Sequence, residues 1–553
     1  MMRHSRRAVT ITVAIALVLW GRGASITCAE SPSFRVQLDA TAAKEPITGR
    51  LFVFLSQSAR GEPRFGPNWF RPEPFFGRDV AAFQPGTICT IDDDADGFPD
   101  ELSRLRPGRY RAQAVLHHDF YSASPGRGEG NLYSDAVWID VNPNAGRTFD
   151  LVLRHVVPPQ PFRQSAWVKE AAVRSEPLSQ FHGREVIERA AVVLPPSYDD
   201  EPNRRYPVVY VIPGFSGSYR GNQWMPLTGP REAEPGEAEL IRVMLDGQCQ
   251  WGHHVYANSQ TNGPRGDALV HELIPHIDRH YRTVAAPTAR FVTGHSSGGW
   301  SSLWLQVSYP DVFGGVWSSS PDPVDFRTFQ GIDLYADPPR NMYRDQQGNR
   351  RPMARRGTRP ILWYDSFTRM DDCLGRGGQL RSFEAVFSPR GPDGLPRKLW
   401  DRATGRIDPE VARAWRKYDI CALVADHWDT LGPKLEGKLH VVVGELDTFY
   451  LESAVHGLAQ TLQQLGSDAQ IEFLPGRDHG TVLTAKQWRK RRREMSEVFM
   501  KYHGAGSGVD DGEIPGNRTA REEPVGYAVQ VGLAIGPRDG HVKSPWADNA
   551  LEN

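Results

Sequence analysis

Short runs of alternating side chains, separated by turns rich in proline and glycine, fill the chain from residue 31 to about residue 160. Clear examples are the runs 51–54, 110–115, 136–141 and 149–153, and no helix-length period lies between them. Alternation with a period of two is typical of β-strands. The pattern therefore predicts a small all-β domain of the sandwich type, followed by a stiff proline-rich linker.

After about residue 180 the pattern changes to apolar runs that alternate with helical periods. The run 208–212 is apolar throughout, as expected of a parallel strand covered on both faces, and the runs 241–245, 291–293 and 441–443 are similar. Asp267 can cap a helix whose apolar residues then recur at four-residue spacing. Strands that alternate with helices predict an α/β fold with a mainly parallel sheet.

Two further segments depart from these patterns. Residues 324–437 are rich in arginine, glycine and proline and form no clear strand–helix units, so they are interpreted as an insertion into the α/β part. From residue 504 on, the chain is rich in glycine and charge, which predicts a flexible tail. The expected organisation is a β-sandwich-like domain at 30–160, an α/β domain at 161–503 that contains the insertion, and a C-terminal tail at 504–553.

The first 29 residues have the pattern of an export signal. Three arginines precede an apolar run at 8–20 that is too short for a comfortable membrane span, and small residues favour cleavage before Glu30. We therefore expect a periplasmic or secreted protein without an integral membrane span, with a short N-terminal anchor as the alternative. The paired arginines leave the general and the twin-arginine export routes both open.

The charge balance and the cysteines limit the partners and the covalent links. Lys and Arg number 65 and Asp and Glu number 66, so the net charge is −1 and no basic surplus is available for nucleic acid. Cleavage would leave four cysteines in an oxidising compartment, where two disulfides in any of three pairings and free thiols are both open. These residues are Cys89, Cys249, Cys373 and Cys421.

The candidate chemistry centres on the pentapeptide Gly294-His295-Ser296-Ser297-Gly298, which is a G-x-S-x-G motif. An apolar strand precedes the motif, and the pattern predicts a helix directly after it. This is the context of a nucleophile elbow, in which a sharp turn holds the serine in a strained conformation and the flanking glycines avoid steric clashes. Ser296 is therefore the candidate nucleophile.

A serine nucleophile needs a base, and the base needs a carboxylate that orients it. The next long apolar strand of the α/β part runs into a loop that carries Glu445 and Asp447, and the last strand runs into a loop that carries His479. The order Ser296, Asp447, His479 is that of α/β-hydrolases. We expect His479 to be the base and Asp447 its partner, with Glu445 as the rival acid.

An oxyanion hole requires two backbone N–H groups. The residue after the nucleophile supplies one of them, and here that residue is Ser297. The second should come from the glycine-rich loop that follows the strand at 208–212. We expect it to be the N–H of Phe215, with a plain tight turn as the alternative interpretation of this loop.

Longer stretches resemble the putative-esterase branch of the α/β-hydrolases, which includes esterase D, enterochelin esterase and the mycolyltransferases called antigen 85. The resemblance covers about residues 180–322 and 435–500 and rests on the segments 206–217, 263–275, 281–283, 294–299, 310–313 and 318–320. It implies hydrolysis of carboxylic esters without a metal or an organic cofactor, and an oxyanion N–H from the residue after the loop glycine, here Phe215. A β-domain before the hydrolase is likewise similar to enterochelin esterase.

Two motifs resemble metal sites without completing them. His271 and His276 are five residues apart, so on a helix they would lie about 140° from each other rather than on one face. Aspartates alternate at 92–96 as in a calcium loop, but Ser103 stands where that loop needs its bidentate glutamate. We expect no metal ligands at the histidines and prefer a solvated acidic turn to a calcium site at the aspartates.

These features predict an exported serine esterase that forms an acyl-enzyme and acts on a small-molecule, glycan or siderophore-type ester. The same triad would serve an acyltransferase or a peptidase, and a non-catalytic binding protein on a hydrolase fold is the alternative from another class. The insertion is expected to cover the catalytic mouth and select the substrate, with Trp363 and Trp400 in the pocket wall. A packing or dimer-contact role is the alternative for the insertion, and the oligomeric state does not follow from the sequence.

Overall fold

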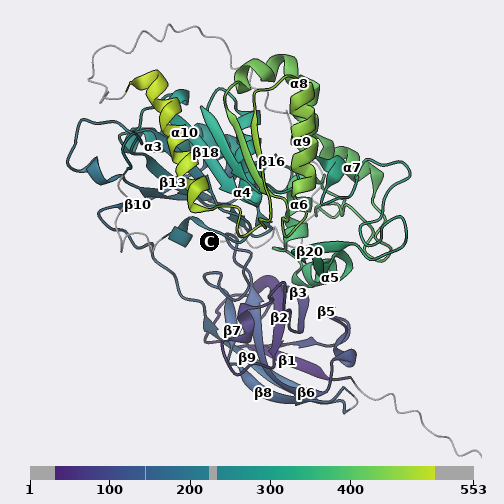
Figure 1. Cartoon of the computed structure of the whole chain (residues 1–553). Helices are drawn as coiled ribbons and strands as arrows, with labels where there is room; N and C mark the ends of the chain where they lie inside the picture. The colour runs from purple at the N-terminus through teal and green to yellow at the C-terminus, as the bar shows by residue number, and fades with distance from the viewer. Residues whose placement is uncertain (1–30, 144, 223–232, 505–553) are drawn as a thin grey trace, which may run out of the picture.

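The protein has two parts, each built around its own large sheet (Figure 1). The computed structural model describes residues 31–143, 145–222 and 233–504. The expected export signal at 1–29 and all but the first residue of the expected tail at 504–553 lie outside the described residues. Among the helices that are described, none is long and apolar enough to cross a membrane.

The first sheet confirms the all-β prediction for the N-terminal part. Its nine strands, in the described residues of 31–156, are hydrogen-bonded in the order β4-β1-β9-β7-β6-β2-β3-β5, with β8 paired to β6. They form one continuous sheet around an apolar core of its own rather than two separate sheets. The strands are β1 (Ser33–Leu38), β2 (Ile47–Ser56), β3 (Phe75–Phe83), β4 (Ile88–Ile91), β5 (Asp96–Phe98), β6 (Gly108–His117), β7 (Leu132–Ser134), β8 (Val137–Val141) and β9 (Thr148–Val156).

Strand β2 buries side chains on both of its faces. Leu51, Val53 and Leu55 pack in the core of the first sheet. Phe52 and Phe54 pack instead in the apolar cluster that is centred on the second part of the protein. Because successive side chains of a strand point to opposite faces, this one strand contributes to two cores at once and joins the two parts.

The second sheet has the α/β-hydrolase arrangement and confirms the prediction of a mainly parallel sheet. In the described part of the chain its eight strands have the order β10-β11-β13-β12-β18-β19-β22-β23. The pairs β10–β11 and β11–β13 are antiparallel, and the pairs that follow are parallel. The strands are β10 (Val168–Arg174), β11 (Ile187–Val193), β12 (Val208–Ile212), β13 (Ile241–Leu245), β18 (Arg290–His295), β19 (Gly315–Ser319), β22 (Leu439–Gly444) and β23 (Gln470–Leu474).

Helices cover both faces of the second sheet (Figure 1). Helix α10 packs Met495 and Phe499 against one face, next to Phe291 of β18. Helix α4 packs against the other face, where Val292 of the same strand is buried. The helices are α1 (Glu176–His182), α2 (Arg265–Ala268), α3 (Ile274–His280), α4 (Ser297–Ser308), α5 (Tyr364–Leu374), α6 (Gln379–Phe387), α7 (Pro409–Trp415), α8 (Ile420–Leu435), α9 (Glu452–Gln464) and α10 (Ala485–His503).

The insertion at 324–437 contacts both parts of the protein: α5 packs against the first sheet, and α8 packs against α4 and α9 of the second part (Figure 1). It contains α5, α6, α7, α8 and the hairpin of β20 (Pro352–Arg356) and β21 (Arg359–Trp363). Arg50 of β2 donates from Nε and Nη2 to the carbonyl oxygen of Cys373 in α5, at 3.2 and 3.0 Å. A methyl group on Gly77 of β3 would lie 2.8 Å from the same oxygen. The first sheet therefore docks closely on the insertion.

The four cysteines of the described chain are free thiols. Cys249, Cys373 and Cys421 are buried, and Cys89 is half-buried. Of the two alternatives that the sequence left open, the structure has the free thiols rather than the two disulfides.

Short strand pairs connect β13 to the helices that follow it. Strand β14 (Gln248–Cys249) pairs with β15 (Gly252–His253), and β16 (Asn258–Ser259) pairs with β17 (Gly263–Pro264). The predicted helix is present as α2 and α3, which are joined by a π-helical turn at Leu269–Leu273. It begins at Arg265, so Asp267 lies in its first turn and accepts a hydrogen bond from the Tyr309 hydroxyl instead of capping the helix.

Candidate active site

Ser296 occupies a strained turn between a strand and a helix. Strand β18 ends at His295 and helix α4 begins at Ser297, and Ser296 between them has φ 60° and ψ −125°. A methyl group on Gly294 would lie 2.0 Å from the Gly298 carbonyl oxygen, and one on Gly298 would lie 2.1 Å from a carbonyl oxygen of β12. Both glycines of the motif are therefore required by close backbone packing, as a nucleophile elbow demands.

Asp447 and His479 lie in the loops that follow β22 and β23. Nδ1 of His479 is 2.8 Å from Oδ2 of Asp447, and Oδ1 of Asp447 accepts a hydrogen bond from the Phe449 N–H at 2.9 Å. Burial acts to raise the pKa of Asp447, but the charge and hydrogen bond of His479 hold that pKa below its usual value. Asp447 in turn raises the pKa of His479 against the effect of burial. Glu445, the rival acid, is exposed.

Two rings hold the His479 imidazole from either side. The centroid of the His295 ring is 4.5 Å from it, and the Phe449 ring meets it edge-on at 5.0 Å. Burial, followed by the charge of His479, lowers the pKa of His295 to about 3. His295 is therefore neutral, and its ring can pack against an imidazole that gains a proton without like-charge repulsion.

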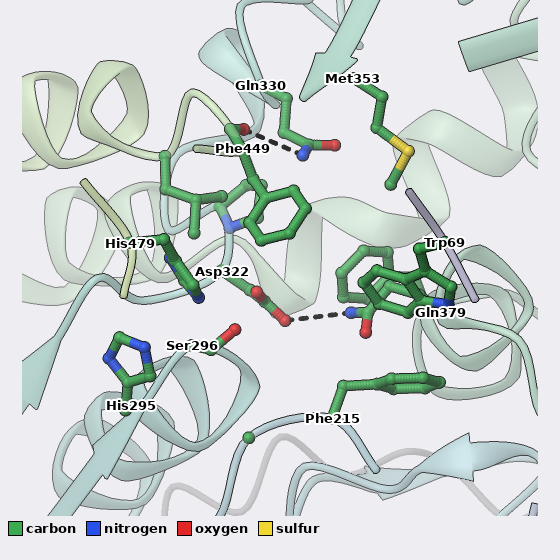
Figure 2. A pocket seen from close by; sticks show the side chains of 14 residues that line it. Trp69, Phe215, His295, Ser296, Asp322, Gln330, Met353, Gln379, Phe449 and His479 are labelled. Atoms are coloured by element: carbon green, nitrogen blue, oxygen red, sulfur yellow. Dashed lines mark hydrogen bonds between the residues drawn. The ribbon is translucent and has the colours of Figure 1, made fainter. Parts of the chain in front are cut away.

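The Ser296 hydroxyl and the His479 ring face the same pocket, and no hydrogen bond joins them in the described structure (Figure 2). Hydrogen bonds between catalytic groups are often loose in an empty site and tighten when a substrate is bound. The arrangement leaves the hydroxyl free on the side that a substrate would approach.

Two backbone N–H groups are available beside Ser296. The loop after β12 passes so close that a methyl group on Gly214 would lie 3.3 Å from Cβ of Ser296. Among the residues that the structure describes, the N–H groups of Phe215 and Ser297 donate to no other group. Both N–H groups are therefore free of other acceptors, with Ser297 at the N-terminal end of α4, and their role in an oxyanion hole stays a prediction.

Ser296 lies in a pocket of about 260 Å³ to which distant segments of the chain contribute (Figure 2). The insertion lines the pocket, as expected, with two glutamines, a methionine and a phenylalanine. The first part of the protein contributes Trp69. The lining residues are Trp69, Gly214, Phe215, His295, Ser296, Asp322, Pro323, Gln330, Met353, Gln379, Phe383, Phe449, Leu451 and His479.

The two tryptophans that were expected in the pocket wall lie elsewhere, so this prediction is wrong. Trp400 is buried, and its Nε1 donates to the Tyr343 hydroxyl at 3.1 Å. Trp363 lies beneath the guanidinium of Arg350 at 5.0 Å from the ring centre. Their bulk suited a wall, but the insertion uses one ring for its own core and the other against a surface arginine.

Asp322 is a pocket residue that the sequence analysis missed. It follows β19, and its Oδ2 accepts hydrogen bonds from the Ser297 hydroxyl at 2.5 Å and from Nε2 of Gln379 at 3.3 Å. Burial raises the pKa of Asp322 to about 6. The signal that could have found it is its place just past a strand end, because polar residues at the carboxyl edge of such a sheet lie at the ligand site.

The described residues contain no group of three or more His, Cys, Asp or Glu side chains that could hold a metal ion. In the acidic turn, Asp92 is paired with Arg78 at 2.7 Å and Asp96 with Arg50 at 2.5 Å. His271 is exposed, and His276 stacks on His280, which is also in α3.

Comparison with known proteins places these features in a family. The family model "Esterase", described as "Putative esterase", matches residues 187–497. Two esterases of Mycobacterium tuberculosis, from strains H37Rv and CDC 1551, are each 30% identical to the chain over 148 residues. The match covers 26% of this chain and 31% of each esterase, so the chain spans about a third of the length of these relatives.

Solved structures of similar proteins include a ferulic acid esterase, which is 13% identical, with a TM-score of 0.36 over 60% of this chain and 98% of that chain. An S-formylglutathione hydrolase from Agrobacterium tumefaciens is 15% identical, with a TM-score of 0.34 over 61% of this chain and 98% of that chain. The family model alone spans more than half of the chain. The chain therefore belongs to the putative-esterase family.

Proposed function

We propose that this protein is an exported serine carboxylic-ester hydrolase in which Ser296, His479 and Asp447 form the catalytic triad. The observation that carries the proposal is the strained turn of Ser296, which presents its hydroxyl to a pocket shared with the Asp447-paired His479. The sequence pattern of an export signal at 1–29 supports the periplasm or the medium as the proposed place of action.

In the proposed reaction, His479 removes the proton of the Ser296 hydroxyl as the serine oxygen attacks the ester carbonyl. The N–H groups of Phe215 and Ser297 stabilise the negative charge that develops on the carbonyl oxygen. His479 then returns the proton to the leaving alcohol, and an acyl-enzyme remains on Ser296. Water repeats the sequence with the same groups and releases the acid.

Asp447 keeps the His479 ring in the orientation and tautomer that this reaction needs. Because Nδ1 of His479 faces Asp447 at 2.8 Å, Nε2 is the nitrogen left for the Ser296 proton. The same contact raises the pKa of His479 and so favours the imidazolium that forms during attack. The neutral His295 ring adds packing without opposing that charge.

The pocket supports a small ester as the substrate. Its rings and aliphatic side chains suit an apolar group, whereas Asp322, Gln330 and Gln379 can accept or donate hydrogen bonds. The reaction requires neither a metal nor an organic cofactor. We propose the α/β domain at 161–503, including the insertion, as the catalytic unit, with a free small molecule or an ester on a glycan or siderophore as the substrate class.

The test compares Ser296→Ala with Ser308→Ala, a serine at the far end of α4 whose hydroxyl has no partner among the described residues. Both variants are purified, shown to be folded, and assayed with p-nitrophenyl acetate and a fluorophosphonate probe. Ser296→Ala should lose labelling and at least about 10⁴-fold in kcat, while Ser308→Ala keeps both. Wild-type protein that neither reacts with the probe nor hydrolyses any ester in a varied panel would identify a non-catalytic binding protein.

A second assay separates hydrolysis from transfer, because the same triad serves both. The wild-type enzyme is incubated with an ester and an excess of a small alcohol or sugar, and the products are identified by mass spectrometry. We expect the free acid as the main product. A new ester as the main product would make the protein an acyltransferase instead.

A further inference from the structure

Trp69 reaches the active-site pocket from the other part of the protein. It lies in the loop between β2 and β3 of the first sheet, more than two hundred residues before Ser296 in the sequence. Its ring centre is 5.5 Å from that of Phe215, and the Phe367 and Phe449 rings meet it edge-on at 5.1 and 6.2 Å. The indole is therefore held by rings from the loop after β12, from the insertion and from the loop after β22.

The loop is shaped to present this side chain. Oδ1 of Asn68 accepts hydrogen bonds from the N–H groups of Phe70 and Arg71, both at 3.0 Å, and so fixes a turn around Trp69. The Phe70 ring follows the indole to the site and lies 6.4 Å from the Phe449 ring. Phe449 in turn packs on His479, the proposed base. The Phe449 ring is therefore all that separates this loop from the base.

The docking of the first sheet fixes where the loop lies. Phe52, Phe54, Phe75 and Phe98 of that sheet are buried in the cluster that contains the insertion and the second sheet. Arg50, which is 5% exposed, spans the contact through its bonds to the α5 carbonyl and to Asp79 and Asp96. An interface that is apolar, closely packed and closed by a buried arginine holds Trp69 at a defined place relative to Ser296.

We propose that the N-terminal β-sheet is a working part of the active site and that Trp69 determines which esters are preferred. The indole closes one side of the pocket and offers a flat apolar surface to the ester group that fills it. Removing it would open the wall and expose that group to water, while the triad stays in place. The inference rests on the proposed esterase function and names the residue that sets its selectivity.

The experiment uses the full chain and three variants. Trp69→Ala removes the wall, Trp69→Phe keeps an aromatic ring, and Trp138→Ala is the matched control, because Trp138 is a 43%-exposed tryptophan on β8 of the same sheet with an arginine over its ring. Two ester series are measured: p-nitrophenyl acetate against p-nitrophenyl hexanoate, and methyl acetate against hexyl acetate. Thermal unfolding and the rate of fluorophosphonate labelling are recorded for each variant.

We expect the preference for the longer chain, expressed as a ratio of kcat/KM values, to fall about tenfold or more for Trp69→Ala in at least one series. Trp69→Phe should restore most of the ratio, and Trp138→Ala should match the wild type. Fluorophosphonate labelling should continue in all three variants, because the triad is untouched. Ratios that stay within twofold of the wild type in both series, or that rise, would overturn the role of Trp69.

The labelling keeps this outcome separate from failure of the proposed function. A wild-type protein that does not react with the probe would refute the esterase assignment, whatever Trp69 does. A protein that is labelled normally in every variant but shows no change in selectivity would leave the esterase assignment intact and refute only the inference. A Trp69→Ala protein with a lower Tm and unchanged ratios would show that the indole only joins the two parts.

Discussion

Asp322 offers a test in which stability and activity should move in opposite directions. The residue is 6% exposed and lies in the pocket between Ser297 and Gln379. Burial raises its pKa from 3.8 to about 6. The folded protein therefore favours the neutral form of this side chain over the ionised form. Asp322→Asn replaces the carboxylate by a neutral amide of nearly the same shape, which can still hydrogen-bond to both neighbours.

The size and the sign follow from the two pKa values. Well below pH 3.8, Asp322 is neutral in both the folded and the unfolded protein, so the substitution should change little. As the pH rises from about 4 to 6, the wild-type protein loses stability because the unfolded chain has released this proton while the folded protein still holds it. A pKa displaced from 3.8 to about 6 corresponds to about 3 kcal/mol. Asp322→Asn should therefore raise the free energy of unfolding by up to about 3 kcal/mol at pH 7.5.

Activity should respond in the other direction. Asp322 is one of the groups that raise the pKa of His479, so its charge favours the imidazolium of the proposed mechanism. In Asp322→Asn the acidic limb of the kcat/KM profile should move to lower pH and the plateau should fall. Replacing a buried charge near a site commonly trades activity for stability in this way.

The assay measures urea unfolding at pH 4 and pH 7.5 and a full pH profile of kcat/KM. Asp200→Asn is the control, because it removes the same charge from an exposed position. The gain in stability should appear at pH 7.5, shrink at pH 4 and be absent from the control. A loss of stability at pH 7.5, or a gain of equal size at both pH values, would refute the reasoning from the raised pKa.

Two further predictions concern the triad and its turn. Asp447→Asn should lower kcat by about 10⁴-fold, whereas Glu445→Gln should stay within about threefold, because Glu445 is exposed; steady-state kinetics with one ester decides, and equal losses would contradict the assignment of the acid. Gly298→Ala would place its methyl group 2.1 Å from the Ile212 carbonyl oxygen, so it should destabilise the fold by about 1–3 kcal/mol or more. Gly108→Ala, whose methyl group would lie 3.4 Å from the end of the exposed Gln57 side chain, its nearest neighbour among the described residues, should leave Tm nearly unchanged, and a normal Tm for both would show that the turn can relax.

The sequence predicted the parts of the site that depend on local patterns. The elbow around Ser296 was found because a strand, a motif and a helix follow one another within a few residues, and backbone sterics require this local order. Asp447 and His479 were predicted because each lies in the loop that follows a predicted strand. The carboxyl ends of parallel strands share one edge of the sheet, and the 2.8 Å contact between the two side chains lies at that edge.

The pocket wall could not be predicted in the same way. Trp363 and Trp400 were chosen for their bulk, but bulk does not show which ring fills a core and which lines a cavity. Trp400 finds a hydrogen-bond partner for its indole inside the insertion, which is a common reason for a buried tryptophan. Asp322 follows a strand end but belongs to no motif, whereas Trp69 is an isolated residue that only the docking of a distant segment brings to Ser296.

The apolar run of β2 does contain information about that docking. The prediction grouped the run at 51–54 with the alternating strands that are typical of a sheet with one face in water, but Leu51, Phe52, Val53, Phe54 and Leu55 are apolar at every position. The second face of this strand therefore needs a cover, and the covered phenylalanines each contribute about 1.5–3 kcal/mol by burial. Left exposed, they would form an apolar patch that a soluble domain rarely tolerates. The same surface that makes the first sheet depend on the hydrolase part also carries the Trp69 loop to the pocket, so the stability of the interface and the selectivity of the site are properties of one contact.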